Sequence, residues 1–367
     1  MAHLCEAERV DALVVYGTSA SARQAQAQVN YLTGFLGFQD AYTVFTPVLE
    51  PILFVQYYNH VANAKRVARA DVRWGGVRSI DAVADELAGR TAAKRIGLVG
   101  PIPYQDHQRL DARLAGVTLV DVTPAFMRLR LVKSDEELKW MQHAASITDQ
   151  ALTALTEAAV PGATELDLQA AAASTAIHAG GQPHFLYLSS TPMANPDRIV
   201  PQQDLRGRQL EQGDVVIFEL SSSYGGYSGQ ILRTLTIEAE MTDLFRRLHE
   251  VAWETFHAIA ATIRPGATAH DVVSAASIIE DRGFTICDDL VHGYGGGYLP
   301  PVLRTRSTSH GPVPDFVFEQ NMTVVIQPNV VTSDGRAGVQ VGELVRVTAD
   351  GVGRLHGGRD VKAEVAG

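Results

Sequence analysis

Cysteine is scarce in this 367-residue chain, and Cys5 and Cys287 lie too far apart to form a CxxC or Cys/His pair. This scarcity argues against a disulfide framework or a structural zinc site and favours a reducing cytoplasm. A net positive charge is also missing: the formal charge is -10, whereas nucleic-acid-binding proteins carry a basic face. No apolar run is long enough to cross a bilayer, and the N-terminal residues lack a signal-peptide pattern. We therefore expect a cytoplasmic protein with no nucleic-acid or membrane partner.

The composition is that of an ordinary globular protein, with 46% hydrophobic and 20% charged residues. A chain of this length is long enough for two domains. Residues 1–130 alternate short apolar runs, such as ALVVYG and RIGLVG, with segments of helical spacing, such as YNHVANAKRVARA. This alternation predicts a small N-terminal α/β domain over residues 1–130. The second predicted domain is 131–367.

The second domain contains an internal repeat. It begins with a long helix that Ser134 and Glu137 start as a capping box and that Pro161-Gly162 ends. The sequence PGAT occurs from Pro161 and again from Pro265, and each copy follows a long helix and precedes two strand-like segments. Two helix–helix–hairpin halves predict a duplicated α+β unit, whose hairpins form a curved sheet covered by helices.

The repeat also relates two polar positions. Glu219 lies in the first strand of the first hairpin, GDVVIFEL, and Gln327 lies in the first strand of the second, NMTVVIQP. Pseudo-symmetry between the halves predicts that these side chains face each other across the sheet. Rigid strands hold side chains accurately, so this is a suitable place for a functional site.

Several motifs occur in order along nearly the whole chain: VNYLTGF, RLRLVKSDEELKWMQ, GDVVIFELSSSYGGYSGQILRT, VHGYGGGYLPP, NMTVVIQP and GVQVGELVRVT. Together they resemble the pita-bread superfamily, which includes creatinase, prolidase and the methionine and Xaa-Pro aminopeptidases. The resemblance implies an α+β fold, with a creatinase-like N-terminal α/β domain followed by a duplicated pita-bread domain. It also implies a homodimer. It predicts the fold better than the reaction, because this fold hosts several chemistries.

The resemblance also implies a position for metal ions. The metallopeptidases of the group hold two divalent ions with two Asp, one His and two Glu side chains. The matching positions in this chain are Glu219, Gln230, His292, Gln327 and Gly342. Hard divalent ions prefer anionic oxygen ligands, whereas amide side chains are neutral and glycine offers no ligand. We therefore expect no dinuclear centre and no cofactor; a single ion on Glu219, His292 and Glu343 is the alternative.

Three residues are candidate catalytic groups. His292 opens the glycine-rich segment HGYGGGY and can act as a general acid or base. Glu219 lies in an apolar strand, where burial raises a carboxyl pKa, although an ion pair with Arg233 on the facing strand is an equally good alternative. His184 lies where the family's strand lines the substrate pocket and is predicted to assist; simple packing is its alternative role.

Further residues are candidate substrate-binding groups, namely Gln230, Gln327, Tyr227, Glu343, Arg304 and His310. The two glutamines offer both a donor and an acceptor. Arg304 could bind a substrate carboxylate bidentately. Glu343 could point into the site or away from it, because neighbouring strand residues face opposite sides.

These residues favour a metal-independent enzyme that hydrolyses a C–N bond of a small polar metabolite, with His292 and Glu219 transferring protons. Three alternatives stay open. One is a lyase, isomerase or cyclase on the same scaffold, and another is a non-catalytic binding protein. The third is a metal-dependent Xaa-Pro-type peptidase.

Overall fold

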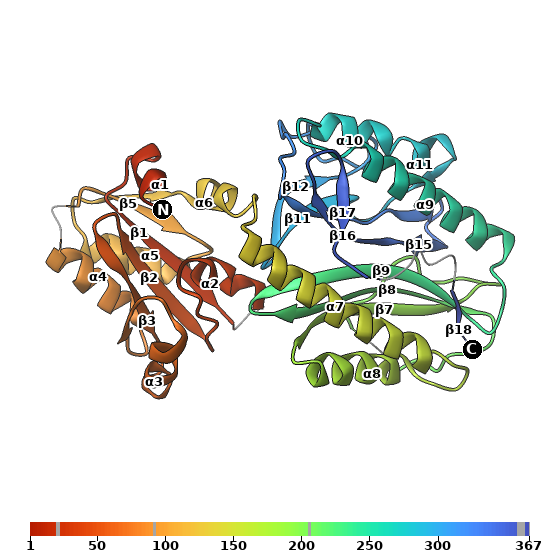
Figure 1. Cartoon of the computed structure of the whole chain (residues 1–367), viewed down its shortest axis with the longest axis horizontal. Coiled ribbons are helices and arrows are strands. Elements are labelled where there is room, and N and C mark those ends of the chain that lie inside the picture. The colour runs from red at the N-terminus through yellow and green to blue at the C-terminus, as the bar shows by residue number, and fades with distance from the viewer. Residues whose placement is uncertain (20–22, 91–92, 205–206, 358–363, 367) are drawn as a thin grey trace. The chain divides into compact units, whose positions relative to one another are not determined.

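The computed structural model describes residues 1–19, 23–90, 93–204, 207–357 and 364–366. The chain divides into two compact units, Met1–Arg130 and Leu131–Gly367, each with its own sheet and hydrophobic core (Figure 1). Within the described ranges, no helix is both long and apolar enough to span a membrane.

Unit 1 is built on a six-stranded mixed sheet of order β4-β3-β2-β1-β5-β6. Its strands are β1 (Ala12–Thr18), β2 (Asp40–Thr46), β3 (Leu49–Val55), β4 (Asp71–Trp74), β5 (Arg95–Val99) and β6 (Thr118–Asp121). The helical segments are α1 (Ala2–Ala7), η1 (Arg23–Gln26), α2 (Ala27–Thr33), α3 (Tyr58–Val67), α4 (Ser79–Arg90), α5 (Tyr104–Arg113) and α6 (Thr123–Leu129). Leu13 and Ala12 of β1 belong to different hydrophobic clusters, so both faces of the sheet are covered. The predicted α/β architecture is confirmed.

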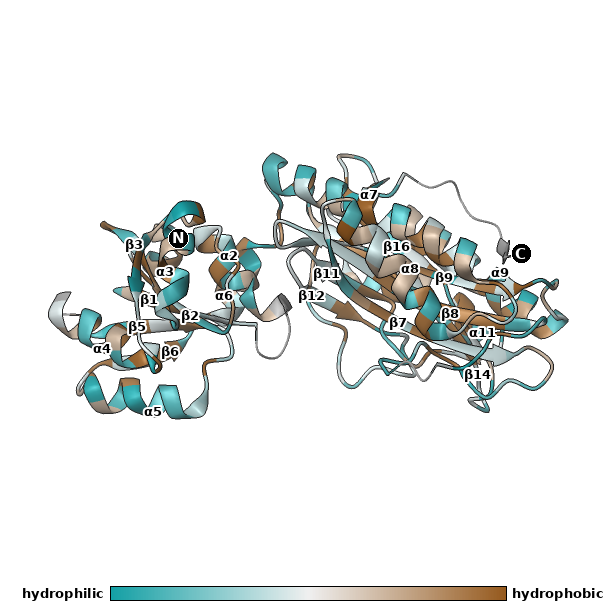
Figure 2. Ribbon diagram, turned by 90° about the horizontal axis from the view of Figure 1, so that it is seen from below, coloured by the Kyte–Doolittle hydropathy of each residue, from teal (hydrophilic) through white to brown (hydrophobic). Residues whose placement is uncertain are grey.

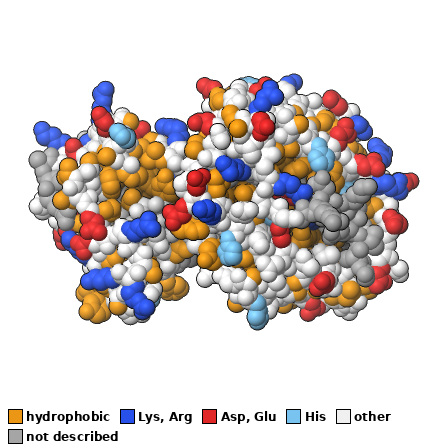
Figure 3. Space-filling model, in the orientation of Figure 1, with side chains coloured by type: hydrophobic (Ala, Val, Ile, Leu, Met, Phe, Trp, Pro, Cys, Tyr) orange, Lys and Arg blue, Asp and Glu red, His pale blue; other side chains and the backbone are white. Residues whose placement is uncertain are grey.

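Large hydrophobic side chains are exposed on unit 1, and Figure 3 shows hydrophobic surface on this unit. They include Phe38, Val48, Tyr58, Trp74 and Val77. Exposed hydrophobic side chains mark a partner surface only where they form a contiguous patch, and single ones are common on monomers. The homodimer stays a prediction.

The structure describes five helices in unit 2, and three of them begin with a capping box. The five are α7 (Asp135–Ala158), α8 (Glu165–His178), α9 (Asp243–Thr262), α10 (Ala269–Ala275) and α11 (Ile278–Asp281). Ser134 and Glu137 form the predicted capping box of α7. The threonines of the two PGAT segments, Thr164 and Thr268, each form a capping box with the aspartate three residues later. The two copies therefore start their helices in the same way.

Unit 2 contains a nine-stranded sheet with the order β12-β11-β13-β16-β9-β8-β7; β17 pairs with β16 and β18 with β9. These strands are β7 (Gln182–Pro192), β8 (Asp214–Tyr224), β9 (Tyr227–Ile237), β11 (Val291–Tyr294), β12 (Tyr298–Leu303), β13 (Thr323–Ile326), β16 (Gly342–Val347), β17 (Val352–Arg354) and β18 (Glu364–Ala366). A three-stranded sheet consists of β10 (Phe284–Thr285), β14 (Asn329–Thr332) and β15 (Gly338–Gln340).

The first predicted hairpin, β8–β9, is present. The strands of the second, β13 and β16, also pair, but they are not joined by a simple turn. Between them the chain folds back as the separate pair β14–β15, which belongs to the small sheet. This inserted pair brings Gln340 toward β9, because Thr234 Oγ1 donates to the Gln340 carbonyl oxygen at 2.8 Å.

Strand alternation gives the large sheet two different faces. Val216, Phe218 and Leu220 of β8 pack in one hydrophobic cluster with residues of α7 and α8. These two helices lie along β7–β9 in Figure 1, and Figure 2 shows hydrophobic residues on these strands. Glu219 lies between Phe218 and Leu220 and therefore points to the other face. That face carries the polar residues described next.

Candidate active site

Glu219 lies in the middle of β8 and is only 5% exposed. Strand pairing places Tyr187 of β7 and Leu232 of β9 opposite Glu219, so their side chains share its face. Burial raises the pKa of Glu219 to about 7, as its apolar strand predicts. A carboxyl with this pKa can exchange a proton near neutral pH.

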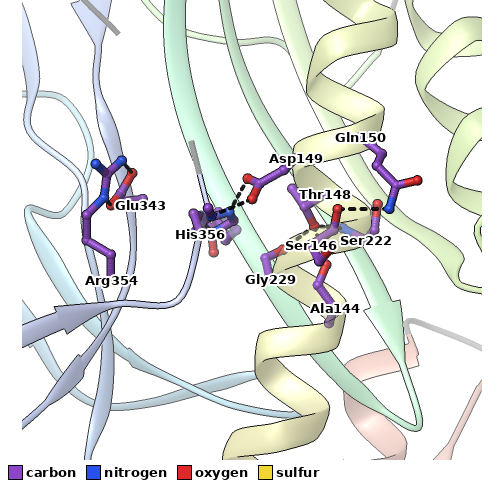
Figure 4. Close-up of polar contacts among 12 residues, drawn as sticks. Ala144, Ser146, Thr148, Asp149, Gln150, Ser222, Gly229, Glu343, Arg354 and His356 are labelled. Carbon is purple, nitrogen blue, oxygen red and sulfur yellow. Dashed lines mark hydrogen bonds and ion pairs between the residues drawn. The ribbon is translucent and has the colours of Figure 1, made fainter. Parts of the chain in front are cut away.

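The alternative that Glu219 pairs with Arg233 is wrong. Arg233 follows Leu232 and points to the opposite face, where its Nη2 lies 3.0 Å from Oε2 of Glu343. Arg354 Nη2 also donates to Glu343 Oε2, at 2.9 Å (Figure 4). Burial opposes ionisation of Glu343, but the hydrogen bond from Arg354 and the charge of Arg233 lower its pKa. Glu343 was predicted to bind substrate; strand alternation instead directs it away from the face that carries Glu219.

Gln340 is the hydrogen-bond partner of Glu219. Its Nε2 donates to Oε1 of Glu219 at 2.7 Å. The backbone of Gln340 is fixed by Thr234, whose Oγ1 accepts from the Gln340 amide at 3.0 Å. Gln340 was not among the residues predicted from the sequence. The sequence did contain a sign of a functional role, because Gln340 is a polar residue between two valines in GVQVGE.

His292 and Gln327 meet on the same face. His292 is fully buried; its Nε2 lies 3.2 Å from Oε1 of Gln327, and its Nδ1 lies 3.1 Å from the Gly293 carbonyl oxygen. Gln230 Nε2 donates to the same Gln327 oxygen at 3.3 Å, and Gln327 Nε2 donates to Asp289 Oδ1 at 2.8 Å. Burial lowers the pKa of His292 to about 4, so the imidazole is neutral at pH 7.

Asp289 is a second buried carboxyl, and it was not predicted from the sequence. Burial, followed by the charges of Asp288 and Glu219, raises its pKa to about 8. Asn329 fixes the loop that carries it: its Oδ1 accepts from the amides of Cys287 and Asp288 at 2.9 and 2.8 Å, and its Nδ2 donates to the Asp289 carbonyl at 2.7 Å. The sequence did contain a sign of this carboxyl, because two adjacent aspartates come directly before LVHG.

Aromatic rings border these polar groups. Tyr298 stacks on His292, with ring centroids 3.9 Å apart and an interplanar angle of 19°. Tyr187, which faces Glu219, stacks on Phe185 at 4.8 Å and 15°. Tyr298 is 41% exposed, so this ring extends from His292 to the surface.

The remaining predicted residues have other contacts. His184 lies at a bulge of β7 with its ring beside Phe185, and Tyr187 rather than His184 is opposite Glu219. Tyr227 donates to Glu137 Oε1 at 2.9 Å. Arg304 donates to two backbone carbonyl oxygens, those of Thr308 and Cys287, both at 3.1 Å. His310 is exposed in a loop.

Asp149 of α7 and His356 contact each other (Figure 4), and His356 also contacts the backbone of Gln230. His356 Nδ1 lies 2.7 Å from Asp149 Oδ1, and its Nε2 lies 2.9 Å from the Gln230 carbonyl oxygen. Beside it, Thr148 Oγ1 accepts from the Ser222 amide at 3.0 Å. The site strands β8 and β9 are therefore tied to the helix through side chains on α7.

The residues at the positions that the resemblance assigns to the metal ligands do not fit a pair of divalent ions. Gln230 and Gln327 supply only neutral amide groups there. At Gly342, any side chain is blocked, because a Cβ atom would lie 2.2 Å from the Ile326 carbonyl oxygen. Across the described part of the chain, no three His, Cys, Asp or Glu side chains are grouped so that they could hold a metal ion.

We expect the stability of the chain to fall as the pH rises from about 6.5 to about 8. Glu219 and Asp289 have folded-state pKa values of about 7 and about 8, whereas unfolded carboxyls titrate near about 4. In this window the folded chain retains protons that the unfolded chain has released, so the free energy of unfolding decreases, by about 2–4 kcal/mol in total. Between about pH 4 and pH 6.5 the buried histidines His292 and His249 act in the opposite direction, because burial lowers their folded-state pKa values to about 4 and only the unfolded chain then binds their protons. The charged and titratable groups acting on the two carboxyls include Asp288, Arg304, Tyr187, Tyr294 and Tyr298.

Urea denaturation at pH 6.5 and pH 8 measures this decrease. The Asp289→Asn variant should show a smaller difference between the two pH values. Asp315→Asn, a matched change at an exposed carboxyl, should behave like the wild type. An equal difference in all three proteins would show that Asp289 is already ionised in the folded state at pH 6.5.

Comparison with known families identifies the chain. The fold is that of a two-domain pita-bread protein of the creatinase/prolidase superfamily. The Creatinase/Prolidase N-terminal domain matches residues 2–132, and Metallopeptidase family M24 matches residues 139–349. The chain belongs to metallopeptidase family M24.

Similar proteins include hydrolases and dipeptidases. The uncharacterized hydrolase/peptidase y4tL of Sinorhizobium fredii is 30% identical over 213 residues, which are 56% of this chain and 53% of that protein. This match therefore spans about half of that relative's length. The Xaa-Pro dipeptidase of Pyrococcus furiosus is 24% identical over 263 residues, or 71% of this chain and 73% of that protein. The crystal structure of the prolidase from Pyrococcus horikoshii OT3 has a TM-score of 0.82 at 21% identity, covering 99% of this chain and 97% of that chain.

These findings correct the predicted function. A metal-independent hydrolase of a small polar metabolite is contradicted, because the family is one of metallopeptidases and the relatives include an Xaa-Pro dipeptidase. The prediction rested on the five residues at the expected metal positions. Similarity along most of the chain instead favours the peptidase alternative.

Proposed function

We propose that this chain hydrolyses short peptides and that a dipeptide of the Xaa-Pro type is its substrate. The observation that carries the proposal is the buried polar face centred on Glu219, in a chain of family M24. The Xaa-Pro dipeptidase among its relatives supports this substrate class.

Glu219 is the proposed proton carrier. Its pKa of about 7 allows it to take a proton from a water molecule that attacks the carbonyl carbon of the peptide bond. When the C–N bond breaks, the same carboxyl returns that proton to the leaving nitrogen. The hydrogen bond from Gln340 holds one carboxyl oxygen, so the other is available for this transfer.

The neighbouring groups are proposed to bind and orient the peptide. Gln230 and Gln327 offer amide donors and acceptors to the peptide backbone. The neutral His292 imidazole lies against Gln327 and under the ring of Tyr298. The rings of Tyr298 and Tyr187 provide flat apolar surfaces that suit a proline ring.

A dipeptidase assay tests the proposal. The full-length chain is incubated with Ala-Pro and with Ala-Ala, in parallel with and without added MnCl₂, and the free amino acids are measured by mass spectrometry. We expect proline to be released from Ala-Pro, at a rate at least about tenfold above the cleavage of Ala-Ala. If neither peptide is cleaved under any condition, the proposed activity is wrong.

A specific observation favours a second candidate, the binding of a short peptide without cleavage. Gln230, Gln327 and Gly342 stand where the family's metallopeptidases carry acidic metal ligands, and the backbone around Gly342 has no room for one. Saturable peptide binding in calorimetry, combined with no cleavage in the assay above, would establish this second candidate instead.

A further inference from the structure

The buried polar face has more hydrogen-bond acceptors than donors. Glu219 and Asp289 each use one carboxyl oxygen to accept from a glutamine, Gln340 and Gln327 respectively. The Oε1 atoms of Gln340 and Gln230 have no hydrogen-bond partner among the residues that the structure describes. Both glutamines are 0% exposed, so water at the surface does not satisfy these oxygens. A buried acceptor without a donor is costly, and a bound ligand with N–H groups would supply the missing donors.

The charges of this face are unbalanced as well. Within the described ranges, neither Glu219 nor Asp289 forms an ion pair with a Lys, Arg or His side chain. Arg304 is close enough to act on Asp289, but its guanidinium donates to backbone carbonyl oxygens. Asp288 adds a third carboxyl to the same neighbourhood. A ligand with a positive charge would therefore be attracted to this face.

Two tyrosine rings lie close to the same carboxyls. The charges of Asp289 and Glu219 both act on Tyr298, and the charge of Glu219 acts on Tyr187, so the rings lie near the carboxyls. Ring faces attract organic cations. Strongly hydrated divalent ions instead need several anionic oxygen ligands, which the glutamines do not provide. An organic cation with N–H groups fits this face. The carboxyls and aromatic rings attract its charge, and the amide oxygens without donors accept its N–H groups.

We propose that this face binds a primary ammonium group, the protonated amino terminus of a short peptide, at the position where the family's metallopeptidases hold divalent ions. Glu219 and Asp289 ionise when the cation binds and then supply the negative charge, and the oxygens of Gln230 and Gln340 accept N–H groups of the ligand. The inference rests on the proposed function, because the peptide substrate carries the ammonium group.

Calorimetry with two ligands tests this inference. The first ligand is a ketomethylene analogue of Ala-Pro, which keeps the free amino group but has no cleavable bond. The second is the same analogue with an acetylated amino group. We expect acetylation to weaken binding to the wild-type chain at least about tenfold, because the amide that replaces the ammonium group has no charge and fewer N–H groups.

A variant pair localises the effect. Glu219→Gln should weaken binding of the free-amine analogue at least about tenfold. Glu319→Gln, the same change at an exposed glutamate, should leave binding unchanged. Equal affinity for the two analogues, no binding of either, or unchanged affinity in a folded Glu219→Gln protein would each overturn the ammonium site.

The two proposals fail in different ways. Cleavage of Ala-Pro together with equal affinity for both analogues would overturn the ammonium site and leave the peptidase activity standing. Preferential binding of the free-amine analogue without any cleavage of Ala-Pro would support the ammonium site and overturn the peptidase activity.

Discussion

Replacement of Glu343 by alanine is expected to lower the free energy of unfolding by about 3–5 kcal/mol. Glu343 is 1% exposed and is the ion-pair partner of Arg233, whose side chain is 4% exposed. The variant leaves the Arg233 guanidinium buried without its counterion, and it removes a partner of Arg354 as well. Backbone oxygens of Leu232 and Gly342 still accept from Arg233, which limits the loss. Urea denaturation followed by circular dichroism measures the change.

Glu254→Ala is the matched control. Glu254 also forms an ion pair with an arginine, Arg282, but both side chains are about half exposed, at 45% and 57%. Exposed pairs contribute about 0–1 kcal/mol, so this variant should change stability little. Equal losses in the two variants would show that burial of the Glu343 pair has no energetic consequence.

Glu219→Gln is expected to lower kcat for Ala-Pro by at least about 100-fold, because an amide of the same size cannot carry a proton between water and the leaving nitrogen. Steady-state kinetics on the purified variant measures the effect. Glu319→Gln controls for the change in net charge. A Glu219→Gln protein with wild-type kcat would exclude Glu219 as the proton carrier, whatever its effect on binding.

The sequence allowed much of the architecture to be predicted, because the signals for it are local. The capping box of Ser134 and the two PGAT segments lie within a few residues of the helices that they start. The raised pKa of Glu219 could be predicted too, because a carboxyl with apolar residues before and after it in the same strand is expected to be buried. The pairing of β13 with β16 followed from the repeat, although the inserted β14–β15 pair did not.

The partners within the site could not be predicted in the same way. Gln340 is 121 residues from Glu219 in the chain, and only the three-dimensional path of β15 brings them together. Asp289 reaches Gln327 across 38 residues because Asn329 fixes its loop. The direction of the Glu343 side chain could not be predicted for another reason. A shift of one residue along a strand reverses the face, and the sequence does not state which face carries the site.

Hydrolysis of Ala-Pro in H₂¹⁸O is the most direct test that this M24 chain cleaves a peptide bond at the Glu219 face. The wild-type chain and the Glu219→Gln variant are incubated with the dipeptide, and the products are weighed by mass spectrometry. We predict one ¹⁸O atom in the carboxylate of the released alanine with the wild-type chain, and almost no product with the variant. Unchanged dipeptide with the wild-type chain, or equal labelling by both proteins, would contradict this function.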